Sequence, residues 1–220
     1  MNPWITRMTT VVLCSVFILQ AGCSSLLAPK PDLTRFYLLA PLSEMGSGSP
    51  ALAVSPGRGD LSIWLGPIML PGYLDRDKIV TRVSANRIDV SEFARWAEPL
   101  GVNVNRVLTE NLATLLGTRK IDIYPFSGPS PDYEIKIDIV HFEPGDDHSA
   151  DLAAHWFIKD GKSKQVLISR DSLVKRSAQS ASTAGSVGAL SEALGEMSIQ
   201  IATALRQVDS AAGPARQRTP

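Results

Sequence analysis

The segment 133-YEIKIDIVHF-142 decides the fold of this chain. Isoleucines at every second position alternate with charged residues, which is the period of a β-strand with one buried face. The isoleucines are Ile135, Ile137 and Ile139. Two further strands are expected at 152–159 and 165–175, and the Asp160-Gly161 pair between them favours a tight hairpin. The segment therefore begins a set of three antiparallel strands.

Two amphipathic helices accompany these strands. The first is predicted over 99–117, because Pro99 suits a first helical turn and Gly117 suits a C-terminal stop. Its apolar residues fall on one face at helical spacing. A second helix carries apolar residues at the same spacing from Val187 to Val208. The fold class is therefore expected to be α+β, with a single mixed or antiparallel β-sheet and two helices packed on one face.

The first half of the chain adds shorter strands. They are expected at 33–40, at 61–70 with a break at Gly66-Pro67, in two short pieces within 79–90, and at 121–124. The segment 41–60 is rich in Gly, Ser and Pro and is predicted to be a flexible surface loop. We expect one domain at 33–208 and a disordered tail at 209–220.

The N-terminus resembles a secretory signal peptide over residues 1–22. Arg7 precedes an apolar run of about a dozen residues, which is shorter than the roughly 20 needed to span a bilayer. Small residues then precede Cys23, which is the arrangement of a bacterial lipoprotein signal whose cysteine is acylated. Gln20 departs from that pattern, because leucine is usual three places before the cysteine. The alternative is an ordinary secretory signal cut near Ala21 or Gly22, with Cys23 incidental.

Acylation of Cys23 would leave residues 23–32 as a tether between the lipid and the domain. More than one acyl chain is needed for stable anchoring, because each buried methylene contributes only about 0.8 kcal/mol. In bacterial lipoproteins an Asp after the cysteine favours retention at the inner membrane. Ser24 stands there instead, and it predicts the outer membrane.

Composition argues against several classes of function. The 22 basic and 22 acidic residues leave no positive excess for nucleic-acid binding. The two cysteines are Cys14, which leaves with the signal, and Cys23, so the mature chain has no thiol for a disulfide or a metal site. No nucleophile-elbow, phosphate-loop or zinc-protease motif occurs. We therefore expect no enzymatic activity and no cofactor.

Two polar clusters are candidate sites. The segment 141–151 offers six side chains of metal-ligand type: His141, Glu143, Asp146, Asp147, His148 and Asp151. Because one loop seldom supplies converging ligands, a solvated turn at Pro144-Gly145 is the preferred interpretation, and no metal is expected. Asp75, Arg76 and Asp77 are interpreted as a salt-bridged loop rather than as an acid–base group.

Four segments in this order resemble the ABC-type transport auxiliary lipoprotein family. They are Arg35-Phe36-Tyr37-Leu38-Leu39, Leu74-Asp75-Arg76, Ile79-Val80-Thr81-Arg82 and Arg95-Trp96-Ala97-Glu98-Pro99-Leu100. The resemblance implies an outer-membrane lipoprotein that faces the periplasm. It also implies work with an inner-membrane protein carrying MCE domains, in a system that moves lipids between membranes, and no catalysis.

Six residues are candidates for a partner interface. Arg82, Arg95, Trp96 and Glu98 either anchor such an interface or form a buried ion-paired joint between the strand region and the first helix. Asp75 and Arg76 are the better interface candidates, because they lie in a constrained loop.

Two functions remain open at this point. The protein is either an adaptor that docks an MCE conduit to the outer membrane or a lipid-binding module that shields an acyl chain itself. The second function predicts a sizeable apolar cavity. Homo-oligomerisation is a further hypothesis, because MCE proteins commonly form rings.

Overall fold

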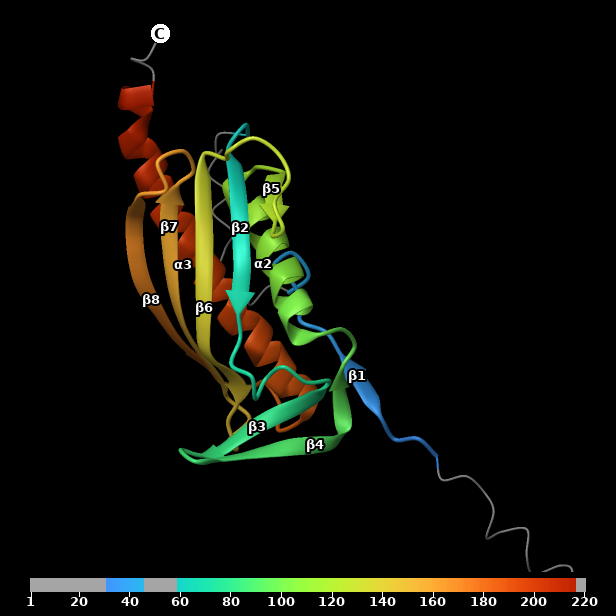
Figure 1. The fold of residues 1–220 in the computed structure, drawn as a ribbon. Helices are drawn as coiled ribbons and strands as arrows, with labels where there is room; N and C mark the ends of the chain where they lie inside the picture. Colours follow the sequence, from blue (N-terminus) through green and yellow to red (C-terminus); the bar gives the residue numbers. More distant parts are fainter. Residues whose placement is uncertain (1–30, 46–58, 217–220) are drawn as a thin grey trace, which may run out of the picture. The chain divides into compact units, whose positions relative to one another are not determined.

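The computed structural model describes residues 31–45 and 59–216, and its compact unit begins at Thr34 (Figure 1). The fold is α+β, as the sequence predicts. In the described residues the strands form a five-stranded and a three-stranded sheet. In spatial order the large sheet contains β5 (Lys120–Ile123), β2 (Ser62–Met69), β6 (Tyr133–Pro144), β7 (Ala150–Asp160) and β8 (Val166–Arg176).

The antiparallel half of the large sheet follows the predicted alternation. β6, β7 and β8 pair antiparallel, with Ile137 opposite Trp156 and both side chains buried. β2 lies parallel to β5 on one side and to β6 on the other. The β2–β6 register shifts between Leu65 and Ile68, at the Gly66-Pro67 break that the sequence indicated.

Both helices cover the same face of the large sheet (Figure 1). α2 (Leu100–Leu116) packs on β2 and β5, and α3 (Thr183–Arg216) packs on β6, β7 and β8. α2 has the predicted limits, because Pro99 is its N-cap and Gly117 ends it at a φ of 68°. α3 continues to Arg216, which differs from the tail expected to be disordered from residue 209. No helix among the described residues is long and apolar enough to cross a membrane.

The prediction of a single sheet is wrong. A second sheet has the order β1 (Arg35–Tyr37), β4 (Arg87–Trp96), β3 (Lys78–Ser84), in which β3 and β4 form an antiparallel hairpin and β1 pairs parallel to β4. One isolated bridge, Arg82 to Gly145, connects its β3 to the end of β6. The parallel pairing of β1 with β4 joins segments far apart in sequence, and no local pattern reports such a pairing.

The first strand is also shorter than the predicted 33–40. After Tyr37 the chain leaves β4 and lies against both helices as a strap, which we define as residues 38–42. Side chains of the helices bind its backbone amides: Leu39 N donates to Asn103 Oδ1 (3.3 Å), Ala40 N to Ser191 Oγ (3.1 Å) and Leu42 N to Asn111 Oδ1 (2.8 Å). Buried amides need partners, and here helix side chains replace a strand neighbour.

Candidate partner interface

Asp75 and Arg76 lie in a well-defined turn between β2 and β3. Backbone hydrogen bonds fix this turn, from Leu74 N to Pro71 O (2.9 Å) and from Asp75 N to Gly72 O (3.3 Å). Leu74 is buried in the core, whereas Asp75 and Arg76 are exposed. The fold therefore presents one acidic and one basic side chain to solvent from a constrained backbone.

A polar cluster beside this turn joins the two sheets. We define this junction cluster as Tyr73, Arg82, His141 and Glu143. Glu143 is 1% exposed, and its carboxylate accepts hydrogen bonds from Tyr73 Oη at 2.8 Å and from Arg82 Nε at 2.5 Å. His141 Nδ1 lies 3.3 Å from the same carboxylate. Because Arg82 belongs to β3 and Glu143 to β6, the ion pair links the small sheet to the large one.

The environment of the junction cluster changes its proton affinities. Burial raises the pKa of Tyr73 to about 12, and the hydrogen bond and negative charge of Glu143 act in the same direction. The hydrogen bond with Glu143 raises the pKa of Arg82 and outweighs the opposing effect of burial. The guanidinium also lies 5.5 Å from the centre of the Tyr73 ring, within cation–π range. At neutral pH the cluster is therefore a neutral phenol between opposite charges.

Arg95 and Trp96 sit side by side in β4 but have different environments. The Arg95 guanidinium forms an ion pair with Asp77, at the end of the β2–β3 turn. Trp96 is 6% exposed and belongs to the core, and its backbone N donates to Asp77 O at 2.7 Å. Both residues therefore stabilise the turn that carries Asp75 and Arg76, and the indole is not presented at the surface.

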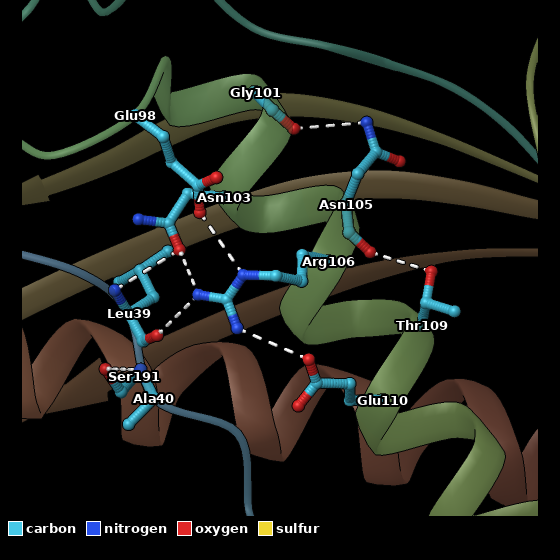
Figure 2. A network of polar contacts seen from close by, with 10 residues as sticks. All are labelled: Leu39, Ala40, Glu98, Gly101, Asn103, Asn105, Arg106, Thr109, Glu110 and Ser191. Atoms are coloured by element: carbon cyan, nitrogen blue, oxygen red, sulfur yellow. Dashed lines mark hydrogen bonds and ion pairs between the residues drawn. The ribbon is translucent and has the colours of Figure 1, made fainter.

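Glu98 belongs to a separate network on α2, shown in Figure 2. Arg106 Nε donates to Glu98 Oε1 at 3.2 Å, and Nη1 donates to Glu110 Oε1 at 3.3 Å. Its Nη2 reaches the strap, where it donates to Leu39 O at 3.2 Å. Partial burial lowers the pKa of Arg106, but the hydrogen bonds with both glutamates outweigh it and raise the pKa above its usual value. Arg106 is therefore positively charged when it binds the strap.

The six candidates thus do not gather at one place. Asp75 and Arg76 are exposed together on the turn, while Arg82, Arg95 and Glu98 each form an ion pair with a different residue of the same chain. The Arg82 pair joins the two sheets and the Arg95 pair joins β4 to the turn, so neither is a buried joint with the first helix. Glu98 does pair with Arg106 of α2, but both side chains are partly exposed. The role of the six residues in a partner interface stays a prediction. Cys23, the candidate lipidation site, lies outside the described residues.

The candidate metal ligands are dispersed in the same way. In the described part of the chain, no group of three or more His, Cys, Asp or Glu side chains converges as metal ligands would. Asp147 instead accepts hydrogen bonds from Ser149, which lower its pKa, and His148 Nδ1 lies 3.2 Å from Ser186 Oγ. Gly145 N donates to Ser149 O at 2.7 Å and closes the turn.

Two of the pockets formed by the described residues lie on or beside these elements. One of about 320 Å³ opens on the uncovered face of the large sheet, where Met69 and Phe157 share it with Lys136 and Asp138. The other, about 240 Å³, lies between the small sheet and the start of α3 and is lined in part by Thr81, Ser91, His148 and Ser186. Neither is an enclosed apolar cavity.

Sequence reasoning missed several residues that organise this region. The sequence pattern does not link Tyr73 and Glu143 to Arg82, and it does not link Asn103 and Asn111 to the strap. A usable signal existed for the asparagines, because both interrupt the apolar face of α2 and are fully buried there. Buried amides on an apolar face require hydrogen-bond partners. The identity of those partners depends on chain segments far away in sequence.

The sequence of this chain is similar to those of known proteins. A family model described as ABC-type transport auxiliary lipoprotein component matches residues 44–202. The intermembrane transport lipoprotein PqiC of Escherichia coli is 23% identical over 138 residues, which is 63% of this chain and 67% of PqiC. The PqiC of Shigella flexneri matches equally.

Solved structures support the same fold. A crystal structure from Xanthomonas campestris superposes with a TM-score of 0.66 at 17% identity, covering 81% of this chain and 99% of that protein. A second crystal structure, of an uncharacterized protein, gives 0.63 at 17% identity, with 78% and 98% covered. The family match extends over most of the folded unit, from the end of the strap region into the middle of α3. The chain therefore belongs to the family of ABC-type transport auxiliary lipoprotein components.

Proposed function

We propose that this protein is the non-enzymatic outer-membrane lipoprotein subunit of a PqiABC-like system for intermembrane lipid transport. Acylated Cys23 anchors it, and the folded domain faces the periplasm. There it docks a conduit formed by an inner-membrane protein with MCE domains, a PqiB-like partner, and supports envelope integrity. The observation that carries the proposal is the family match over most of the folded unit, behind a lipoprotein-type signal.

The proposed docking element is the exposed turn with Asp75 and Arg76. A loop suits recognition when its backbone is ordered before binding, because less conformational entropy is then lost. This turn meets that condition through the buried Leu74 and the ion pair of Asp77 with Arg95. Opposite charges side by side favour a partner surface with the complementary arrangement, and such charges contribute mainly to specificity and association rate.

The alternative function is a free-standing lipid-binding lipoprotein that shields acyl chains itself. It calls for an apolar cavity that encloses the chain. The two pockets described above, both formed by described residues, open to solvent, and the larger of them is lined in part by Lys136, Asp138 and Lys159, so neither would enclose an acyl chain. On this ground we prefer the adaptor.

Homo-oligomerisation belongs to the same proposal. If the conduit is a ring, an adaptor that is also a ring shares its symmetry. Closed symmetry is the usual arrangement of soluble homo-oligomers. Mass photometry of the domain without its lipid tests this point. A single species at the monomer mass at all concentrations would contradict it.

The first experiment is a pull-down of the native lipoprotein from crosslinked envelopes, with mass spectrometry of the captured proteins and lipids. The control variant is Cys23→Ala. Recovery of an MCE-domain protein, together with loss of outer-membrane fractionation in the variant, is the expected result. Stoichiometric phospholipid without an MCE partner would support the alternative and overturn the adaptor.

The docking turn is tested by charge reversal. Asp75→Lys with Arg76→Glu preserves the net charge but inverts the arrangement, and we expect loss of the crosslink to the MCE protein with unchanged fractionation. The matched control is the same reversal at Arg87 and Asp89, an exposed ion pair on β4. Equal crosslinking in both variants would exclude the turn as the docking element.

A further inference from the structure

Large apolar side chains are exposed on β1, just beyond it and on the neighbouring β4. Phe36 in β1 is 65% exposed, Leu38 in the strap is 50% exposed, and Phe93 in β4 is 47% exposed. Single exposed apolar residues are common and need no explanation. Several on one face of a small sheet are less usual and point to a contact.

The register of the small sheet places Phe36 and Phe93 on the same face, and Leu38 follows in the strap just beyond β1. Phe36 is paired with Arg95 in the parallel ladder, so their side chains point to one side. Phe93 precedes Arg95 by two residues and shares that side, while Ala94 and Trp96 between and beyond them are buried on the other. Leu38 follows Phe36 by two residues, and Ala97 N binds Tyr37 O there at 2.9 Å.

Charged groups border these apolar residues. Lys78 is paired with Arg95 in the antiparallel ladder and lies on the same face, and Arg95 is paired with Asp77. With one acidic and two basic groups, this face has a slight positive excess. Apolar rings bordered by basic side chains are typical of a surface that lies in a membrane interface.

We infer that this membrane face, defined as Phe36, Leu38 and Phe93, rests on the bilayer that holds the protein's own lipid anchor. The inference relies on the proposed acylation of Cys23. The described chain begins at Pro31, just before β1, and the segment from Cys23 to Phe36 reaches at most about 45 Å when fully extended. β1 is therefore among the parts of the domain that the anchor holds nearest to the lipid.

The tether also explains how so small a face binds. Three partly exposed side chains give weak membrane affinity on their own, as single interfacial contacts do. An anchor makes the second contact intramolecular and raises its effective concentration. Binding is consequently expected only in the tethered protein. Contact by this face would fix the orientation of the domain and direct the far end of β7 and β8 away from the bilayer.

The experiment measures the depth of a fluorophore in vesicles of phosphatidylethanolamine and phosphatidylglycerol. A single cysteine carries an environment-sensitive dye. It stands either at Ala97→Cys, an exposed position directly after β4, or at Lys162→Cys, in the exposed β7–β8 turn. That turn lies at the end of the large sheet remote from the small sheet (Figure 1). Quenching by spin-labelled lipid reports proximity to the bilayer.

Two tethers separate this inference from the proposed lipidation. One sample is the native lipoprotein, whose acylation is verified by mass; the other carries a hexahistidine tag in place of Cys23 and binds nickel-chelating lipid. A native sample without acyl chains would contradict the proposed function and leave the result on the nickel tether valid. The untethered mature chain shows whether the tether is needed.

We expect several-fold stronger quenching at Ala97→Cys than at Lys162→Cys on either tether. Phe36→Ser with Phe93→Ser lowers the first value to the second, with an unchanged circular dichroism spectrum. The matched control is Leu173→Ser, which removes an exposed apolar side chain from β8 and leaves the quenching unchanged. Equal quenching at both labels, or no effect of the double variant in a folded protein, would overturn the inference.

Discussion

Gly195 of α3 lies so close to Leu42 of the strap that a Cβ atom on the glycine would come within 2.7 Å of Leu42 Cδ2. The same atom would lie 3.3 Å from Met45 Cε. A glycine inside a helix costs about 1 kcal/mol relative to alanine. Here it allows the buried Leu42 to pack directly on the helix. The packing of the strap therefore depends on a residue that lowers the helix propensity of α3.

Gly195→Ala is therefore expected to destabilise the protein, although alanine favours the helix. Overpacking of a filled core costs about 1–3 kcal/mol, which exceeds the gain in helix propensity. Gly188→Ala is the matched control, because a Cβ there meets nothing within 4 Å, and it is expected to stabilise by up to about 1 kcal/mol. Urea unfolding of both variants gives the comparison. Equal stabilisation by both would show that the strap yields freely.

Arg82→Ala is expected to be costly because it leaves the Glu143 carboxylate buried without its cation. Removing one partner of a fully buried ion pair costs about 3 kcal/mol or more, and the loss here is expected to approach the lower end of that range because Arg82 is 25% exposed. The control is Arg87→Ala, whose pair with Asp89 is exposed on both sides and is expected to contribute less than about 1 kcal/mol. Both free energies of unfolding are measured at pH 7. Similar losses would mean that the junction cluster contributes no more than a surface pair.

The junction cluster also predicts a dependence on alkaline pH. The pKa of Tyr73 rises from the usual 10.0 to about 12 on folding. Its contribution to stability is thus complete below about pH 10 and is lost as the pH rises through 12, because the unfolded chain ionises first. Tyr73→Phe should fall less steeply over this window than the wild type in denaturant unfolding. Parallel curves for the two proteins would contradict the prediction.

The sequence predicts those parts of the fold whose determinants are local. The limits of α2 follow from Pro99 and Gly117, and the antiparallel strands follow from alternation and the Asp160-Gly161 turn. The second sheet escapes prediction because β1 joins β4 through a parallel pairing across more than fifty residues. Glu143 escapes for a similar reason: its burial is set by Tyr73 and Arg82, not by its neighbours in sequence.

The candidate interface residues also differ in how far their environments can be predicted from the sequence. A constrained turn at Asp75 and Arg76 is readable from its Pro, Gly and Asp content, and the structure does place both side chains in solvent. The roles of Arg82, Arg95 and Glu98 cannot be predicted from the sequence. The local sequence around an arginine or glutamate is the same whether the side chain pairs within the chain or with another protein. Trp96 shows the same ambiguity, since its buried indole is decided by packing across the sheet.

Asn111→Ala is expected to loosen the strap more than its size suggests. The side chain is buried, accepts a hydrogen bond from Leu42 N at 2.8 Å and donates one to Ser198 Oγ at 3.1 Å, so alanine leaves a buried strap amide without a partner. Such a loss costs about 1–3 kcal/mol. Thr109→Ala is the control, because Thr109 Oγ1 donates to Asn105 O within α2 and, among the described residues, forms no hydrogen bond with the strap. Hydrogen exchange should accelerate at the Leu42 amide in the first variant alone, and unchanged protection there would show that apolar packing, not Asn111, holds the strap.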